Sequence, residues 1–359
     1  MTFSEHFNLT QEICYLNSSG NGLIPKRSLQ WRRDWEQQFF QVETDLRDQQ
    51  ASFLQTVKET IARVFHAQGH KIYLSPNFSF AYASLIDRLP RDYHYLAIEG
   101  EYPSILYPII SRELSFRTVK ADQQVEENII AALQEKRTQV LVISIVQYIS
   151  GLKVDVSFFK RLKQQFPDLL ILADGSQYLG TENFSFTDSG IDALACSGYK
   201  WLCGGFGNGF LLINKTFQAF LDQLVVDIPM PTADFWKTKS VLDTFFEPGH
   251  VDTVSQGTLR ESLSLLEELG FEPIAKHIQV LSDEAYELLD DRGLLLPEIA
   301  ARRNRSALIN IQVDPSQYPA FLAAGIKCFP RGTGIRIGIH LYNERSDIHR
   351  LIATIDKLR

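Results

Sequence analysis

Short apolar runs that stop at polar turns alternate with helical patterns between residues 70 and 215. Uninterrupted apolar runs are typical of strands buried on both faces of a parallel sheet. The apolar spacing between the runs, as in 80–89 and 156–166, predicts helices. This alternation predicts an α/β domain with a mainly parallel sheet. The expected strands are Lys71 to Leu74, Tyr95 to Ile98, Gln139 to Val146, Leu169 to Ala173, Ile191 to Cys196 and Phe210 to Ile213.

Helical patterns predominate on either side of this region. Residues 25–67 predict two consecutive helices, and the helix predicted for 259–269 ends at Gly270, a residue type favoured there. Several prolines predict a long irregular connection over residues 226–250, and the chain after residue 290 has a mixed α+β pattern. The expected domains are a large α/β domain, 16–252, and a small α+β domain, 1–15 plus 253–359.

The composition is that of an ordinary globular protein, with 45% hydrophobic and 22% charged residues among 359. A net charge of −7 argues against a nucleic-acid binder, which would carry a basic face. No apolar run approaches the roughly 18 residues that span a membrane, and the N-terminus does not resemble a signal peptide. The four cysteines are scattered without metal-type spacing, which favours a reducing compartment, so a cytoplasmic location without membrane attachment is expected.

Charged and amide side chains follow two of the predicted strands. Asp174 and Gln177 come after the strand 169–173, and Lys200 comes after the strand 191–196. Open α/β sheets bind ligands at the carboxyl ends of their strands, so these side chains should meet there. A single aspartate would more often cap a helix, and a single lysine would more often be solvated. Together they favour a site for pyridoxal 5'-phosphate (PLP).

The segments ADGSQYLG, SGYKW and GGFGNG, within 173–209, resemble the central block of the class V aminotransferase family. This family of fold type I PLP-dependent enzymes includes cysteine desulfurases, selenocysteine lyases and kynureninases. The resemblance implies a mainly parallel seven-stranded sheet, a homodimer and catalytic roles for Lys200 and Asp174. Lys200 would form the Schiff base with PLP, Asp174 would pair with the pyridinium nitrogen, and Gln177 would bind the 3-oxygen of the ring.

The resemblance also implies further contacts with the cofactor. Tyr102 matches the residue that stacks on the pyridine ring. The turn before the helix 80–89 matches the segment around the phosphate, although capping of that helix by Ser75 or Asn77 is the alternative explanation. The residues implied to hold the phosphate are Asn77, Phe78, Ser79, Ser197 and Tyr199.

The remaining candidates line the expected substrate side. Gln147 is favoured as the polar residue near the cofactor, with Tyr148 as the alternative because the register is uncertain by one residue. Arg336, in the strand 335–339, matches the family's arginine for the substrate carboxylate, and a planar guanidinium suits that group. Asn17 lies in a turn expected at the mouth of the site. His250 stands where the family commonly has threonine in a cross-subunit phosphate contact, so this contact is in doubt.

These residues predict an enzyme that acts on a small amino acid and a 2-oxo acid. Transamination needs no further residue, so an aminotransferase is the first expectation. A desulfurase would need a nucleophilic cysteine on a mobile loop, whereas Cys328 falls in a predicted strand and is expected to pack in the core. Lyase, kynureninase-like hydrolase and epimerase activities remain open. The non-enzyme alternative is a PLP-fold binding or regulatory protein that has lost catalysis.

Overall fold

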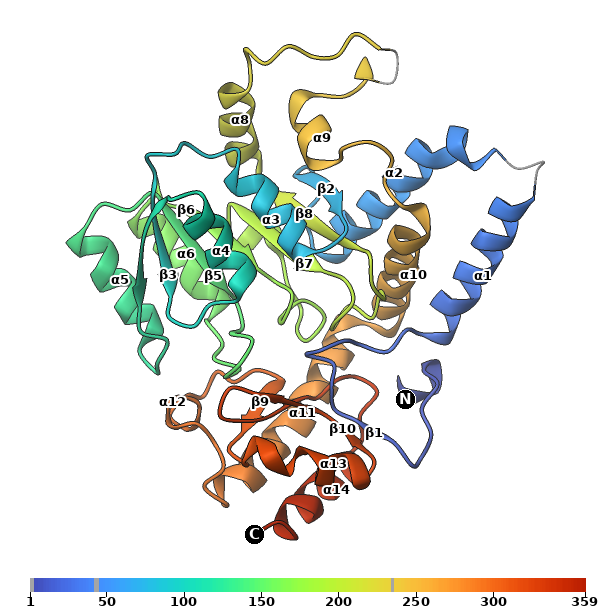
Figure 1. The fold of residues 1–359 in the computed structure, drawn as a ribbon, viewed down its shortest axis with the longest axis vertical. Helices are drawn as coiled ribbons and strands as arrows, with labels where there is room; N and C mark the ends of the chain where they lie inside the picture. Colours follow the sequence, from blue (N-terminus) through green and yellow to red (C-terminus); the bar gives the residue numbers. More distant parts are fainter. Residues whose placement is uncertain (1–2, 42–44, 234–235) are drawn as a thin grey trace.

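The computed structural model describes residues 3–41, 45–233 and 236–359. A seven-stranded sheet forms its centre, in the order β2-β8-β7-β6-β5-β3-β4 (Figure 1). Only β8 runs antiparallel to its neighbours β2 and β7, while the remaining pairs are parallel. The predicted α/β fold with a mainly parallel seven-stranded sheet is therefore confirmed. The strands are β2 (Lys71–Ser75), β3 (His94–Ile98), β4 (Ser115–Val119), β5 (Val140–Ser144), β6 (Leu170–Asp174), β7 (Ala193–Ser197) and β8 (Gly209–Ile213).

Helices cover both faces of this sheet. Alternate residues of β5 belong to two apolar clusters, with Leu141 and Ile143 in one and Val140 and Val142 in the other. The second cluster includes residues of α3 (Phe78–Ile86), α4 (Pro103–Ser111), α8 (Lys215–Leu224) and α9 (Val241–Phe246). The first includes residues of α2 (Leu46–Val64), α5 (Val125–Glu135), α6 (Val156–Gln165) and α10 (Thr253–Leu269). Burial on both faces explains why these strands are continuously apolar.

The connection expected to be irregular over 226–250 contains a helix, α9. Ser240 caps this helix, its hydroxyl accepting from the N–H of Asp243, while the Asp243 carboxylate accepts from the N–H of Ser240. Such reciprocal capping stabilises a helix too short to show periodicity. The same segment follows α8 and leads into α10, which packs beside α1 (Lys26–Phe40) and α2 (Figure 1). The prediction of an irregular connection was therefore wrong for these residues.

The C-terminal part of the chain forms a second structural layer below the large sheet in Figure 1. Its strands β11, β12 and β9 form an antiparallel sheet, and β1 pairs with β10, which joins the N-terminal residues to this part. This pairing is compatible with the predicted domain boundaries, which stay a prediction. Besides α7 (Phe186–Ser189), which lies between β6 and β7 in the sequence, the remaining elements are η1 (Phe3–His6), β1 (Cys14–Tyr15), α11 (Phe271–Asp290), α12 (Pro297–Ala300), β9 (Leu308–Ile311), η3 (Pro315–Gln317), α13 (Tyr318–Ala323), β10 (Ile326–Lys327), β11 (Phe329–Arg331), β12 (Gly334–Gly338) and α14 (Arg345–Asp356).

Candidate functional site

The carboxyl ends of β6 and β7 are joined by hydrogen bonds. Asp174 ends β6, and its Oδ1 accepts from the N–H of Ser176 at 2.8 Å. The Ser176 hydroxyl oxygen accepts in turn from the N–H of Ser197, the last residue of β7, at 3.0 Å. Because β6 and β7 are parallel neighbours, these bonds hold Asp174 and the turn that carries Lys200 at one edge of the sheet.

Asp174 is a buried carboxyl without a cationic partner. Its exposed fraction is 8%, and no ion pair in the described part of the chain uses it. Burial raises the pKa of Asp174, and the positive charge of Lys200 partly opposes this shift. A cation at this position would therefore stabilise the ionised form.

Lys200 lies between two aromatic rings at the same edge. Its Nζ is 5.8 Å from the ring centroid of Tyr102 and 5.8 Å from that of Tyr199. Burial among these groups lowers the pKa of Lys200 to about 8; Asp174 opposes the shift, and the cationic Arg336 reinforces it. A lysine with this pKa is neutral in roughly a tenth of molecules at pH 7, far more than an ordinary lysine, and the neutral amine is the form that a nucleophile or base requires.

Arg336 reaches the same region from β12 in the C-terminal part. Its NH1 donates to the carbonyl oxygen of Tyr148 at 2.7 Å, while its Nε is buried without a hydrogen-bond partner among the described residues. Burial, helped by Arg331, lowers the pKa of Arg336 to about 10. Arg336 is 4% exposed and forms no ion pair in the described ranges, so its buried charge is not neutralised by a carboxylate of the protein.

The phosphate residues expected from the sequence lie at the start of α3. Asn77 caps the helix, with Oδ1 accepting from the N–H of Phe80 at 2.9 Å, which confirms the capping alternative for this side chain. Phe78 packs its ring against Tyr82, and its N–H donates to the Ser197 hydroxyl at 2.9 Å. Ser79 hydrogen-bonds Ser104 at the start of α4, so two helix N-termini meet here. Helix N-termini attract anions, and the phosphate role of these residues stays a prediction.

The two glutamines expected at the cofactor are engaged within the protein. Gln147 donates to the carbonyl of Gly100 at 2.6 Å and accepts from the N–H groups of Ile149 and Ser150. The amide of Gln177 donates to the carbonyl of Ser19 at 2.9 Å and accepts from the indole of Trp201 at 2.8 Å. Both amides therefore hold loops in place, and their contacts with PLP stay predictions.

Tyr148, the alternative to Gln147, packs edge-on against Tyr102 with ring centroids 5.1 Å apart. Together with Tyr199, these two tyrosines raise the pKa of Arg336, so all three rings lie near the guanidinium. Tyr199 itself stacks on the exposed ring of Phe206. The tyrosines thus line the space between Lys200 and Arg336, and this geometry favours Tyr148 over Gln147 as the residue that faces it.

The two remaining candidates lie at other places. Asn17 forms a bridge to Gly338 at the end of β12, and its Oδ1 is buried without a partner among the described residues. Asn17 thus lies opposite Gly338, which is two residues after Arg336 on β12. His250 is exposed and its Nδ1 hydrogen-bonds Gln50 of α2 at 2.8 Å. Its cross-subunit role stays a prediction.

Glu101 is a buried group that the sequence analysis did not single out. Its carboxylate accepts from the N–H and the hydroxyl of Ser144, both at 2.6 Å, and from the N–H of Tyr102 at 3.1 Å. Burial raises the pKa of Glu101 to about 7, and nearby Asp174 adds to this shift. Glu101 thus fixes the backbone of Tyr102. Its position just after a predicted strand, like that of Asp174, could have identified Glu101 as a candidate from the sequence.

The low pKa of Lys200 has a testable consequence in cofactor-free protein. An acylating reagent is expected to modify Lys200 increasingly as the pH rises through about 8, because only the neutral amine reacts. An ordinary lysine is half neutral only near its pKa of about 10.4, so its labelling is expected to rise at a higher pH than that of Lys200. Peptide mass spectrometry measures the labelled fraction against pH. The exposed Lys276 is the control, and identical pH midpoints for both lysines would contradict the assignment.

All four cysteines are free and buried. Burial raises the pKa of Cys14, Cys196 and Cys203, and raises that of Cys328 to about 12. Cys328 lies between β10 and β11, at the break between two short strands, rather than inside the single strand expected at 326–329. In this conformation none of the four thiols has the properties of a nucleophile.

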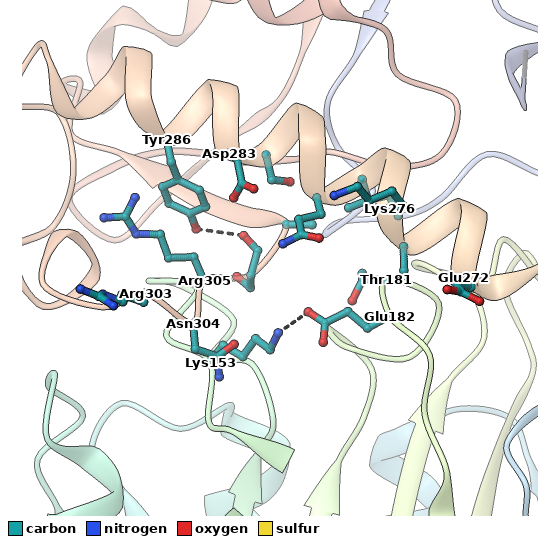
Figure 2. A pocket seen from close by; sticks show the side chains of 16 residues that line it. Lys153, Thr181, Glu182, Glu272, Lys276, Asp283, Tyr286, Arg303, Asn304 and Arg305 are labelled. Atoms are coloured by element: carbon teal, nitrogen blue, oxygen red, sulfur yellow. Dashed lines mark hydrogen bonds and ion pairs between the residues drawn. The ribbon is translucent and has the colours of Figure 1, made fainter. Parts of the chain in front are cut away.

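A separate cleft of about 510 Å³ lies between α11 and the turn before β9 (Figure 2). Asp283 and Tyr286 of α11 line one side, and the ion pair between Lys153 and Glu182 lines the other. None of the candidate site residues lines this cleft. The candidate site is therefore defined by its side chains rather than by this cleft. In the described ranges, no helix is long and apolar enough to cross a membrane, and no cluster of His, Cys, Asp or Glu is suited to a metal ion.

Comparisons with known proteins show a matching family and a relative over most of the chain. The sequence pattern of the aminotransferase class-V family matches residues 15–351. The uncharacterized aminotransferase YcbU of Bacillus subtilis (strain 168) is 22% identical over 318 residues, which cover 83% of this chain and 82% of YcbU.

Two solved structures share the fold. The apo cysteine desulfurase from Thermococcus onnurineus NA1 has a TM-score of 0.81 at 16% identity, covering 99% of this chain and 96% of the other. The cystine C-S lyase C-DES, in complex with its reaction product cysteine persulfide, also has a TM-score of 0.81 at 16% identity, with 96% and 97% covered. The fold type I assignment is thus confirmed, and because the match spans nearly the whole sequence, the chain belongs to the class V aminotransferase family of PLP-dependent enzymes.

Proposed function

We propose that the protein uses PLP to remove the Cα proton of a small amino acid held between Lys200 and Arg336. One observation carries this proposal. A buried carboxylate without a cation, Asp174, and a buried guanidinium without an anion, Arg336, both act on the pKa of the lysine between them. Uncompensated buried charges are costly, so sites that hold them are usually completed by ligands of opposite charge.

The residues present fit PLP. When bound, PLP withdraws electrons from the substrate Cα and so acidifies its proton. Asp174 would pair with the protonated ring nitrogen, and the attraction of two unit charges about 4 Å apart is about 4 kcal/mol at an effective dielectric of 20. Lys200 would hold the cofactor covalently, and Tyr102 would pack on its ring. Ser197, Ser79 and the start of α3 would receive the phosphate.

On the substrate side, Arg336 would bind the α-carboxylate through the free edge of its guanidinium, since NH1 already donates to Tyr148. That contact would orient the amino acid so that the Cα proton faces Lys200. Once the substrate amine had replaced it in the covalent link, the neutral amine of Lys200 would be free to accept this proton and to donate it to another carbon of the bound molecule, as expected of a base with a pKa near 8. The three tyrosine rings would exclude water from the space between them.

Transamination is the reaction we propose first, because it needs only these residues. A C–S lyase is the second candidate, since the structural relatives include a cystine C-S lyase and a cysteine desulfurase. A desulfurase mechanism based on the protein's own thiolate is disfavoured, because all four cysteines are buried with raised pKa values. Lysis that needs no protein thiol remains compatible with the site.

Product analysis separates the two reactions. The holoenzyme is incubated with cysteine or another amino acid, with and without a 2-oxo acid. An aminotransferase is expected to produce a new 2-oxo acid and a new amino acid in equal amounts, only when the acceptor is present, and no ammonia. A lyase acting on cysteine would release pyruvate, ammonia and sulfide without an acceptor. If the cofactor binds and no amino acid is consumed, a binding or regulatory protein becomes the better interpretation.

We also propose a cytoplasmic homodimer. The free thiols suit a reducing compartment. Phe39 and Phe40, at the end of α1, are 72% and 81% exposed, and a partner subunit would cover such apolar side chains. Light scattering of the holoenzyme tests the dimer, and a monomeric mass would contradict it.

A further inference from the structure

A second arginine lies on the same face of the hairpin as Arg336. Strands β11 and β12 are antiparallel, and Phe329 lies directly opposite Arg336. Directly opposite residues project from the same face of a sheet, as do residues two apart on one strand. Phe329, Arg331 and Arg336 therefore share one face. The other face carries Ile335 and Ile337, which are fully buried in the core.

Phe329 connects the two arginines. The guanidinium of Arg331 lies 5.1 Å from the centroid of the Phe329 ring, in a cation–π arrangement. The side chain of Arg331 is thus directed along the hairpin towards the position of Arg336 rather than away from it. This contact limits the freedom of an otherwise exposed side chain.

The tip of the hairpin packs against the loop that follows β5. A Cβ atom at Gly332 would lie only 2.6 Å from Cγ2 of Ile149, so the tip touches the residue next to Tyr148. Tyr148 in turn accepts the hydrogen bond from Arg336. The charge of Arg331 also lowers the pKa values of both Lys200 and Arg336. Arg331 therefore lies on the exposed side of this region, close enough for its charge to act on both Lys200 and Arg336.

Two cations on one face favour the binding of an anion. In the described ranges neither Arg331 nor Arg336 forms an ion pair, and the carboxylates near Lys200 lie deeper, at the ends of β6 and β3. An α-carboxylate on Arg336 leaves Arg331 without a partner. A second anionic group on the same molecule would pair with it and relieve the repulsion between the two guanidinium groups.

We propose that Arg331 binds the side-chain anion of the substrate, and that the substrate is an amino acid with an acidic side chain. A carboxylate, sulfinate or sulfonate would satisfy the same guanidinium. This inference rests on the proposed function, in which Arg336 binds the α-carboxylate. Arg331 is then the residue that determines specificity, while Lys200 and Arg336 serve any amino acid.

Binding of carboxylates that lack an amino group tests the inference without turnover. Calorimetry on the holoenzyme compares succinate and glutarate with butyrate, which has one carboxylate. The dicarboxylates are expected to bind on the order of 10- to 100-fold more tightly, because their second carboxylate adds one charged hydrogen-bonded pair with Arg331. Arg331→Gln should remove this preference and leave butyrate binding unchanged. Arg303→Gln, at an exposed arginine by the separate cleft, is the control and should preserve the preference.

The outcomes separate this inference from the proposed function. Equal affinities for succinate, glutarate and butyrate, or a preference that persists in Arg331→Gln, would overturn the role of Arg331. Preferential binding that depends on Arg331, in a holoenzyme that converts no amino acid, would support the anion site and refute the proposed enzyme. An Arg331→Gln protein that retains the cofactor absorbance of the wild type shows that the substitution has not disturbed Lys200.

Discussion

Replacing Lys200 by alanine is expected to abolish turnover and the visible absorbance of covalently held cofactor. Lys200 is the lysine between Asp174, Tyr102 and Tyr199, and its lowered pKa equips it for both the covalent link and proton transfer. Loss of a general base alone costs about 10²- to 10⁴-fold in rate, and loss of the covalent link adds to this. Absorbance spectra of the purified holoenzyme and a turnover assay measure the two effects.

The control for this substitution is Lys276→Ala, on the exposed side of α11. It should keep the spectrum and the rate of the wild type. An unchanged cofactor spectrum in Lys200→Ala would refute the assignment of this lysine. Thermal unfolding of the cofactor-free forms should give similar midpoints for Lys200→Ala and the wild type, because removing a partly buried amine relieves its desolvation.

Replacing Arg336 by glutamine is expected to preserve the cofactor spectrum and to weaken substrate binding by about 100-fold. A bidentate guanidinium–carboxylate contact contributes roughly 1.5–3 kcal/mol, and glutamine cannot form it. Glutamine is shorter than arginine and loses the contact with the carbonyl of Tyr148, so thermal unfolding of the variant must show that the protein remains folded. KM from initial rates, together with spectral titration by the substrate, measures the loss.

Arg303→Gln is the matched control, because it removes an arginine that lines the separate cleft. It should leave KM unchanged. If Arg336→Gln lowered kcat with an unaltered KM, the guanidinium would act in the transition state rather than in substrate binding. Loss of the cofactor spectrum would place Arg336 at the cofactor instead.

The presence of Asp174 and Lys200 at one edge of the sheet could be predicted because it depends on local sequence. An apolar run that is buried on both faces must be a strand, and the residue after it must lie at the sheet edge. Arg336 could be predicted only through family resemblance, since its strand belongs to another part of the chain. Its contact with Tyr148 spans 188 positions of sequence.

The hydrogen bonds that the two glutamines form within the protein could not be predicted from the sequence. Gln147 and Gln177 have the right chemistry and stand at the right places, yet their amides are hydrogen-bonded to Gly100, Ser19 and Trp201. A buried amide binds whichever backbone groups lack a partner, and these come from segments distant in sequence. Glu101 is similar, because its carboxylate accepts a hydrogen bond from the N–H of Ser144, which lies 43 residues away in the sequence.

The start of α10 is another feature that could not be predicted from the sequence. Its first turns carry Ser255, Gln256 and Thr258 on buried positions, and at Gly257 a Cβ would lie 1.9 Å from the indole of Trp31. No apolar periodicity marks such residues, so the sequence predicted this helix only from residue 259. By itself, the sequence determined where the strands lie along the chain and which reactive side chains follow them, because burial and turns are local properties. The tertiary structure alone decided which polar groups support the fold and which remain available to a ligand, because hydrogen-bond partners are chosen by contacts between distant segments.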